Sequence, residues 1–407
     1  PSNRRTFVSV SAIKWTPSAV IAAVMAAGVI AVPLQANAAN LPEKSAEDII
    51  ALMALEPVAF SGTVLKTTDL GLPELEMSSL VSDEMVAQME ETMPEGFEDF
   101  IPQLIDDNTI TEAISFLAGT DRVRVFVSNE GLRAQILDPL SQRDVVVNAN
   151  EAWGYNAKTQ TATHVTFEQP LDSADWDDAA ASLEVDLSNP NTLTAYVLEQ
   201  AGPNTTVTVG DPRTVAGRAS YTLVLEPNDS ASLVDYVTLS IDSETGLGLS
   251  VQVFSTQQES VALVVEFETL NLSTPDASLF SFRPPPGATI EEPALPADFE
   301  ASLRQLASGE LDEGQKEAFA GELFSIFGEG LEPRQIGEGW GTVMALNNLP
   351  AGFPREMLES ELLSGLTLPV LGGTVFSTPL VNVLVTDSGE VYAGALTVRA
   401  LLDIAAG

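Results

Sequence analysis

The residue types that do metal and nucleophile chemistry are nearly missing from this chain. It has one histidine, His164, and no cysteine. Zinc sites and covalent nucleophiles depend on these side chains, and a serine triad would need His164 together with a Gly-x-Ser-x-Gly turn, which the chain lacks. His164 lies in an alternating run at 161–167, a pattern typical of a strand-surface residue. We therefore expect no enzyme, no metal ion and no cofactor.

Acidic side chains are abundant, with 58 Asp and Glu against 18 Lys and Arg and a formal charge of -40. The turn with Asp172, Asp175, Asp177 and Asp178 could hold calcium through oxygen ligands, but it lacks the glycine-turned spacing of a dedicated loop. With so many acids, no single pair points to glycoside hydrolysis. The charge argues against nucleic acid as a partner, and it also fits a salty habitat, where screening weakens self-repulsion.

A methionine stripe is the more suggestive feature. Met85, Met89 and Met93 recur every four residues and would share one face of a helix near 82–92. Methionine adapts its shape to apolar ligands. Two interpretations stay open: the stripe packs on a sheet as core, or it forms a lid over an apolar cavity.

The first 38 residues have the pattern of a cleaved export signal. Arg4, Arg5 and Lys14 precede an uncharged apolar stretch at 19–34, and residues 36–38 supply small side chains for cleavage. The stretch is short for a membrane-spanning helix, so we expect cleavage rather than a retained anchor. Residues 3–8 resemble the twin-arginine pattern. These features predict a soluble mature protein in the cell envelope, on the outer side of the cytoplasmic membrane, with neither lipid anchor nor disulfides.

The elements that must position any site begin with a short helix after Ser45, followed by strand signals every eight to twelve residues. We expect strands at 60–67, 122–127, 132–137, 144–148, 152–156, 162–167, 207–210, 218–226, 234–241, 248–254 and 261–272. A helix is predicted at 191–200, and residues 74–108 look like a helical insertion. One face of this antiparallel meander is apolar throughout.

A proline-rich stretch from Pro284 to Pro296 is expected to be an extended connector that cannot continue a sheet. It sets the predicted boundaries: a first domain at 39–290, a linker at 291–297 and a small α+β domain at 298–407. In the last unit we expect helices at 299–307, 313–327, 356–363 and 398–404. We also expect a strand at 341–346 and a hairpin joining 380–386 to 390–396.

Several motifs, in this order, resemble the LolA, LolB and RseB superfamily of periplasmic lipoprotein-binding proteins, in its extended two-domain Gram-positive form. The clearest are Ser61-Gly62-Thr63-Val64, Trp153-Gly154-Tyr155-Asn156, Val215-Ala216-Gly217-Arg218, Ile241-Asp242-Ser243-Glu244-Thr245-Gly246 and the stretch from Phe280 to Pro284. The resemblance covers residues 44–290. It implies an unclosed β-barrel, a strongly curved antiparallel sheet lidded by helices, which binds acyl chains of lipoproteins or lipids without catalysis.

The resemblance also gives candidate cavity residues: Leu65, Leu72, Met85, Met89, Met93, Val125, Trp153 and Tyr155. For Trp153, an aromatic core plug is the alternative interpretation. Arg124, Arg133 and Arg218 are scarce cations that either counter a ligand headgroup or form structural ion pairs. A second function stays open, in which the protein is an RseB-like sensor whose C-terminal domain binds an envelope signalling (anti-sigma) protein. An exposed apolar patch within 300–407 would favour that function.

Overall fold

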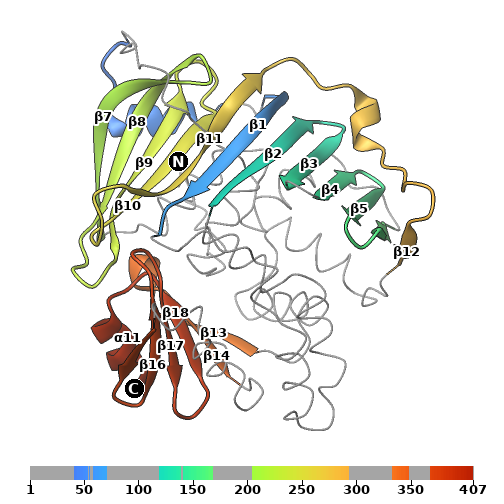
Figure 1. Cartoon of the computed structure of the whole chain (residues 1–407). Helices are drawn as coiled ribbons and strands as arrows, with labels where there is room; N and C mark the ends of the chain where they lie inside the picture. Colours follow the sequence, from blue (N-terminus) through green and yellow to red (C-terminus); the bar gives the residue numbers. More distant parts are fainter. Residues whose placement is uncertain are drawn as a thin grey trace, which may run out of the picture.

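The computed structural model describes residues 41–53, 55, 58–70, 119–138, 141–167, 204–292, 332–347 and 367–406. These residues form mostly β structure in two sheets (Figure 1). The export signal, the methionine segment, the acidic turn at 172–178 and the helices expected at 191–200, 299–307, 313–327 and 356–363 lie outside them.

The larger sheet has 12 strands in the order β12-β6-β5-β4-β3-β2-β1-β11-β10-β9-β8-β7. Its strands are β1 Phe60–Thr68, β2 Gly119–Ser128, β3 Gly131–Asp138, β4 Ser141–Asn148, β5 Glu151–Asn156, β6 Thr161–Thr166, β7 Thr205–Val215, β8 Arg218–Pro227, β9 Val234–Asp242, β10 Gly248–Ser255, β11 Val261–Asn271 and β12 Thr289–Glu291. Neighbours are antiparallel except β12, which runs parallel to β6. Sequential hairpins build both wings of the sheet, so the strand meander expected from the sequence is confirmed.

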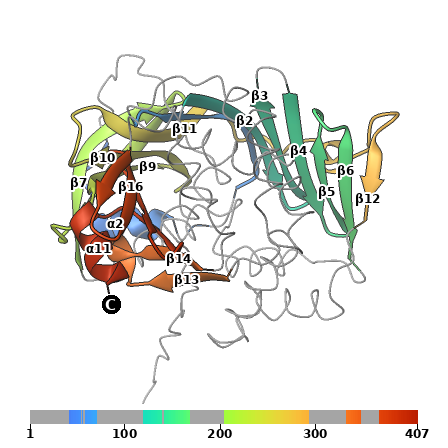
Figure 2. The same ribbon diagram turned by 60° about the horizontal axis from the view of Figure 1, so that its bottom comes forward.

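The sheet is strongly curved and open. β1 lies at its centre, between β2 and β11, and the strands on either side bend away to form an arch (Figure 2). Both outer strands, β7 and β12, leave one edge unpaired among the described residues. This shape is that of an unclosed half-barrel.

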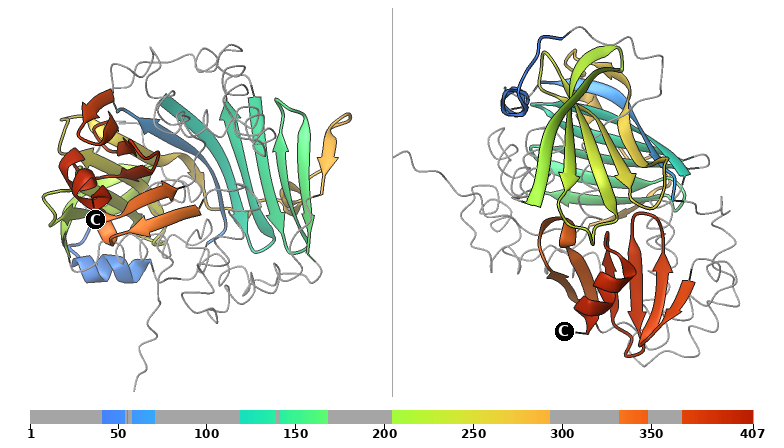
Figure 3. Two further views of the ribbon diagram at one scale, coloured as in Figure 1. Left: turned by 90° about the horizontal axis from the view of Figure 1, so that it is seen from below. Right: turned by 90° about the vertical axis from the view of Figure 1, so that its left-hand side faces the viewer.

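Helix α2, Ala46–Leu52, precedes the sheet and packs on one face of its β7–β11 wing (Figure 3). Ser45 caps it: the serine side chain accepts a hydrogen bond from the backbone N–H of Asp48, and the Asp48 carboxylate accepts one from the backbone of Ser45. This capping box satisfies donors that the first helical turn leaves open. Ile49 and Met53 then join the hydrophobic core under the sheet.

The second sheet has six strands in the order β13-β14-β18-β17-β16-β15. Its elements are β13 Glu332–Ile336, β14 Val343–Asn347, β15 Thr367–Val370, β16 Gly373–Ser377, β17 Asn382–Thr386, β18 Val391–Gly394 and the closing helix α11 Val398–Ala405. The predicted hairpin, the strand near 341–346 and the last helix are therefore present. The sequence did not predict β13, β15 or β16, which are short, and two of which contain a proline.

The second sheet docks on the β8–β10 end of the first through backbone and side-chain bonds. The Leu233 N–H donates to Ala395 O, and the Thr397 N–H donates to Ala231 O, each at 2.8 Å. The indole N–H of Trp340 donates to Thr205 Oγ1 at 2.8 Å. Leu380 also enters the core of the large sheet. The two sheets thus share buried surface.

Two expectations about strands were wrong. The connector between Pro284 and Pro296 contains a strand, because β12 pairs with β6 and the Thr289 N–H donates to Gln160 O at 2.9 Å. A parallel edge strand needs only a few residues free of proline, which residues 289–291 provide. β7 continues five residues beyond its predicted end at Gly210, since the register shifts between Gly210 and Arg213 and Pro212 is tolerated on an edge strand.

Candidate apolar binding face

Strand register assigns the side chains of the large sheet to two faces. Residues directly opposite each other in paired strands point to the same side. Val64 pairs with Val123 and Phe267, whereas its neighbour Leu65 pairs with Arg122 and Glu266. We call the side with Val64 the apolar face and the side with Leu65 the polar face.

The apolar face runs through the middle of the sheet and along both wings. Its members are Phe60, Val64, Val123, Val125, Val127, Leu132, Ala134, Ile136, Val145, Val147, Tyr221, Leu223, Leu225, Val237, Leu239, Ile241, Val251, Val253, Leu263, Val265 and Phe267. On the β7–β11 wing, α2 covers it, and Leu380 and Ala395 of the second sheet contribute to the same core. Most of these side chains are buried.

The β2–β5 wing of the apolar face is more open. Val145 keeps 41% of its surface exposed. Its partner in β5 is Gly154, and a Cβ added at Gly154 would meet nothing within 4 Å. Beside them, the face presents the small side chains of Ala134 and Ala152. The described residues therefore leave this part of the apolar face partly uncovered at Val145 and Gly154.

A buried cation interrupts the apolar face at its centre. Lys66 alternates with Val64 in β1, its side chain is 1% exposed, and its ammonium donates to Asp121 Oδ2 at 2.7 Å. Asp121 lies opposite it in β2 and is 30% exposed, so the pair reaches the rim of the face. Burial lowers the pKa of Lys66, and the aspartate opposes this shift. The pair places a polar recognition group beside an apolar surface.

The predicted cavity residues divide between the two faces. Val125 lies on the apolar face and is 3% exposed. Leu65, Trp153 and Tyr155 lie on the polar face. Trp153 is opposite Val146, and the same cross-strand row continues through Arg133 and Phe126 to Ser61, which lies on the Leu65 side of β1. Leu72, Met85, Met89 and Met93 lie outside the described residues. The structure thus brings Trp153 and Tyr155 together but not with Val125.

Trp153 is the centre of an aromatic cluster on the polar face. It stacks on His164 with ring centroids 3.8 Å apart, and Phe282 contacts both Trp153 and Tyr155. Phe282 arrives on the segment after β11, whose short helix η3, Ala277–Phe280, crosses this face. Trp153 is 8% exposed, as a core plug would be. This cluster fastens the segment that leads to β12.

His164 takes part in this packing and in two polar contacts. Its Nε2 lies 2.9 Å from Glu151 Oε2, and its Nδ1 lies 3.5 Å from Glu292 Oε1. Glu292 directly follows β12, so His164 links that strand to the sheet. These contacts explain the histidine as a strand-surface residue with a structural role. Within the described ranges, no group of three His, Cys, Asp or Glu side chains could hold a metal ion.

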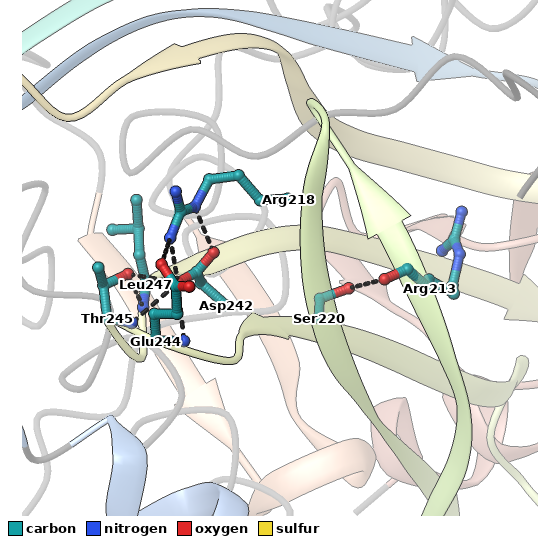
Figure 4. Close-up of polar contacts among 7 residues, drawn as sticks. All are labelled: Arg213, Arg218, Ser220, Asp242, Glu244, Thr245 and Leu247. Atoms are coloured by element: carbon teal, nitrogen blue, oxygen red, sulfur yellow. Dashed lines mark hydrogen bonds and ion pairs between the residues drawn. The ribbon is translucent and has the colours of Figure 1, made fainter. Parts of the chain in front are cut away.

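Two of the three arginines singled out from the sequence form structural ion pairs on the polar face. Arg133 pairs with Asp144 at 3.0 Å and also donates to Leu279 O. Arg218 donates to both oxygens of Asp242 and to Glu244 (Figure 4). Neither guanidinium reaches the apolar face. Lys66 does lie on the apolar face, and its alternation with Phe60 and Val64 was the signal in the sequence. Register also places Arg143 on this face, opposite Ile136 at the start of β4.

Comparison with known proteins yields structural likenesses only. No protein-family model matches the chain, and no curated protein matches it. Similar solved structures include MucB, 14% identical over 89% of this chain and 96% of that one, with a TM-score of 0.38. An uncharacterized conserved protein from Thermus thermophilus is 10% identical over 61% of this chain and 98% of that one, with a TM-score of 0.31.

A third likeness is to the LolA superfamily protein NE2245 from Nitrosomonas europaea, 9% identical over 59% of this chain and 99% of that one, with a TM-score of 0.23. This name is that of the superfamily that the sequence motifs resemble. All of these TM-scores are below 0.5, so what the site can do follows from the chain's own strands and side chains. In the described part of the chain, no helix is both long and apolar enough to cross a membrane.

Proposed function

We propose that this chain is an exported binding protein that carries or holds an acyl-chain ligand, such as a lipoprotein or lipid, on its apolar face without catalysis. The observation that carries the proposal is the uneven cover of that face. Over the β7–β11 wing α2 and the second sheet complete a core, whereas Val145 and Gly154 on the other wing border open space.

The chemistry of the open wing suits a flexible hydrocarbon chain. The side chains of Ala134, Val145, Val147 and Ala152 offer no hydrogen bonds there, so binding would depend mainly on area removed from water, at roughly 25 cal/mol per Å². Arg143 lies on the same face at the start of β4 and adds a donor at that end. The Lys66–Asp121 pair at the centre of the sheet would meet the polar end of the ligand.

The first test is native mass spectrometry, with lipid extraction, of the protein purified from its own envelope. The proposal expects a stoichiometric acylated ligand. A clean mass without ligand, from protein that also fails to take up a fluorescent fatty-acid probe, would overturn it.

A matched pair of variants tests where such a probe binds. Val145→Glu places a charge on the open wing, and we expect at least about tenfold weaker binding because the carboxylate must be desolvated by the acyl chain. Val209→Glu is the control, since Val209 in β7 is 43% exposed, close to the 41% of Val145, but lies at the far edge. Equal binding by both variants would place the ligand elsewhere.

A second candidate function is that of a regulatory sensor whose C-terminal sheet binds an envelope signalling protein, as the sequence resemblance allows. The favouring observation is the outer hairpin of that sheet, where Leu368 is 53% exposed and Leu371 is 97% exposed. A photo-crosslinker placed at position 371 should then capture a single partner in cells. The control is position 388, which is also exposed and lies at the turn between β17 and β18. Equal capture at both positions would count against this function.

A further inference from the structure

The outer half of β7 bends over the polar face of the β8–β11 wing. β7 and β11 have three strands between them in the sheet, yet their Cα atoms approach within 8 Å. The bend follows the register shift between Gly210 and Arg213. In the part of β7 beyond this shift, Arg213 Nη2 lies 3.5 Å from Glu266 Oε2 of β11. The wing therefore rolls up on its polar side.

Small hydroxyl side chains line the inside of this roll. Thr222, Ser240, Ser250 and Glu266 pair in sequence across β8, β9, β10 and β11, so they form one row pointing to the same side. Their exposures are 4%, 1%, 1% and 0%. Serine and threonine are short, so the row keeps its hydroxyl groups close to the sheet, on the side from which the longer side chain of Arg213 approaches Glu266.

Several polar atoms in the roll are buried without a hydrogen-bond partner among the described residues: Arg213 Nη1, Thr222 Oγ1, Thr238 Oγ1, Ser240 Oγ and Glu266 Oε1. Folded proteins pair more than about 90% of such groups, because a buried unpaired donor or acceptor costs roughly 1–3 kcal/mol. Thr222, Ser240 and Glu266 belong to one cross-strand row and Arg213 lies across from Glu266, so one ligand could satisfy these four groups together.

The chemistry of the row restricts that ligand. Arg213 can only donate and the Glu266 carboxylate accepts, so the ligand must both accept and donate hydrogen bonds. The guanidinium and the carboxylate cancel in charge, which disfavours an ion of either sign. Gly210 shows how little room there is, since a Cβ there would lie 3.1 Å from Val224. We infer that the roll binds a cluster of ordered water molecules, which bridge Arg213, Ser240, Thr222 and Glu266 and hold the bent half of β7 in place.

A crystal structure of the full chain at about 1.5 Å resolution tests this directly. We expect at least one fully occupied water within hydrogen-bond distance of both Ser240 Oγ and Glu266 Oε1, with a temperature factor close to that of the main chain. Side chains that instead bond to one another in a dry roll would overturn the inference, as would density for a larger molecule.

Solution measurements on a matched pair of variants give an independent answer. In the native protein, magnetisation transfer from long-lived water should reach the amide protons of residues 222 and 240. Thr222→Val keeps the shape but removes a hydroxyl, so the transfer near residue 222 should be lost or at least halved. Thr208→Val on exposed β7 is the control and should leave it unchanged. Native signals without any transfer from water would contradict the inference even if the variant failed to fold.

Discussion

Two arginines of the β7–β8 hairpin, Arg213 and Arg218, lie beside buried carboxylates that are hydrogen-bonded to very different degrees. Figure 4 shows the cluster around Arg218 and the position of Arg213. Asp242 accepts from Arg218, from the backbone N–H of Glu244 at 3.1 Å, and from both the backbone N–H and the hydroxyl of Thr245 at 2.8 and 2.9 Å. Glu266 accepts from Ser250 at 2.7 Å and faces Arg213 at 3.5 Å, and Gln252 lowers its pKa from nearby. Among the described residues, however, none gives its Oε1 a well-formed hydrogen bond.

The difference shows that burial alone does not decide the charge of a carboxyl group. Burial would raise the pKa of both. For Asp242 the hydrogen bonds from Arg218, Thr245 and Glu244 outweigh burial and hold its pKa below the ordinary value. For Glu266 burial wins over Ser250 and Arg213, so its pKa is raised. The Asp242 turn is a complete structural site, whereas the Glu266 row depends on something more.

The largest expected effect is at the complete site. Asp242→Ala leaves Arg218 with only the exposed Glu244 as a partner and removes the acceptor that closes the turn. We expect a loss of about 3–5 kcal/mol in the free energy of unfolding, measured by urea denaturation. Asp242→Asn, which keeps one acceptor for Thr245, should lose less. If Asp242→Ala cost no more than Glu266→Ala, the contrast between the two sites would be wrong.

Glycine substitutions ask whether the Asp242 turn is also stabilised by α2. Gly246 has φ +74 and a Cβ there would lie 2.0 Å from Leu52 O, whereas Gly217 has φ +78 and no neighbour within 4 Å. Gly217→Ala should cost roughly 1 kcal/mol for the left-handed backbone alone. Gly246→Ala should cost about twice that or more, because α2 must shift. If both variants lost the same free energy of unfolding, α2 could shift away from residue 246 at no cost.

Arginine replacements compare the two pairs directly. Arg213→Met should cost only about 1 kcal/mol, since its contact with Glu266 is long and partly exposed pairs contribute little. Arg218→Met should cost more, because it removes several short hydrogen bonds to Asp242. Urea unfolding of both variants at one pH makes the comparison, with Arg213→Lys as a control that keeps the charge. A larger loss at Arg213 would mean that the water-bridged roll is the stronger site.

The smallest effects concern pH. The folded state binds a proton at Glu266 more tightly than the unfolded chain, so stability should fall as pH rises from the ordinary glutamate pKa through the raised one. Glu266→Gln should flatten this part of the profile. Asp242 acts in the opposite sense: its contribution is full above the ordinary aspartate pKa and is lost as pH drops through the lowered value. If the dependence of stability on pH stayed the same in Glu266→Gln and Asp242→Asn, the two carboxyl groups would not differ in their pKa shifts as described.

The strands were predictable because alternation fixes both their position and their sidedness. In β8 and β11, the series Tyr221, Leu223, Leu225 and Leu263, Val265, Phe267 identified the apolar face correctly. In β1 and β5 the apolar side chains of Leu65 and Trp153 lie on the polar face, so side-chain type alone does not show which residues share a side with Val64. Aromatic side chains there are covered by the segment after β11, a long-range contact that no local pattern records. The bend in β7 could not be predicted locally either, because Arg213 there contacts Glu266, which is far along the chain.

The central position of β1 has a consequence for how the protein is made. Ser61 pairs on one side with Phe126 and on the other with Asn271, and Ser232 near β9 bridges to Leu396 close to the end of the chain. Until β11 has been synthesised, β1 exposes a long apolar strand edge that could pair with another chain. Folding can therefore be completed only after most of the polypeptide has emerged. A chaperone that shields β1 during this interval would raise the yield of native protein by blocking such pairing.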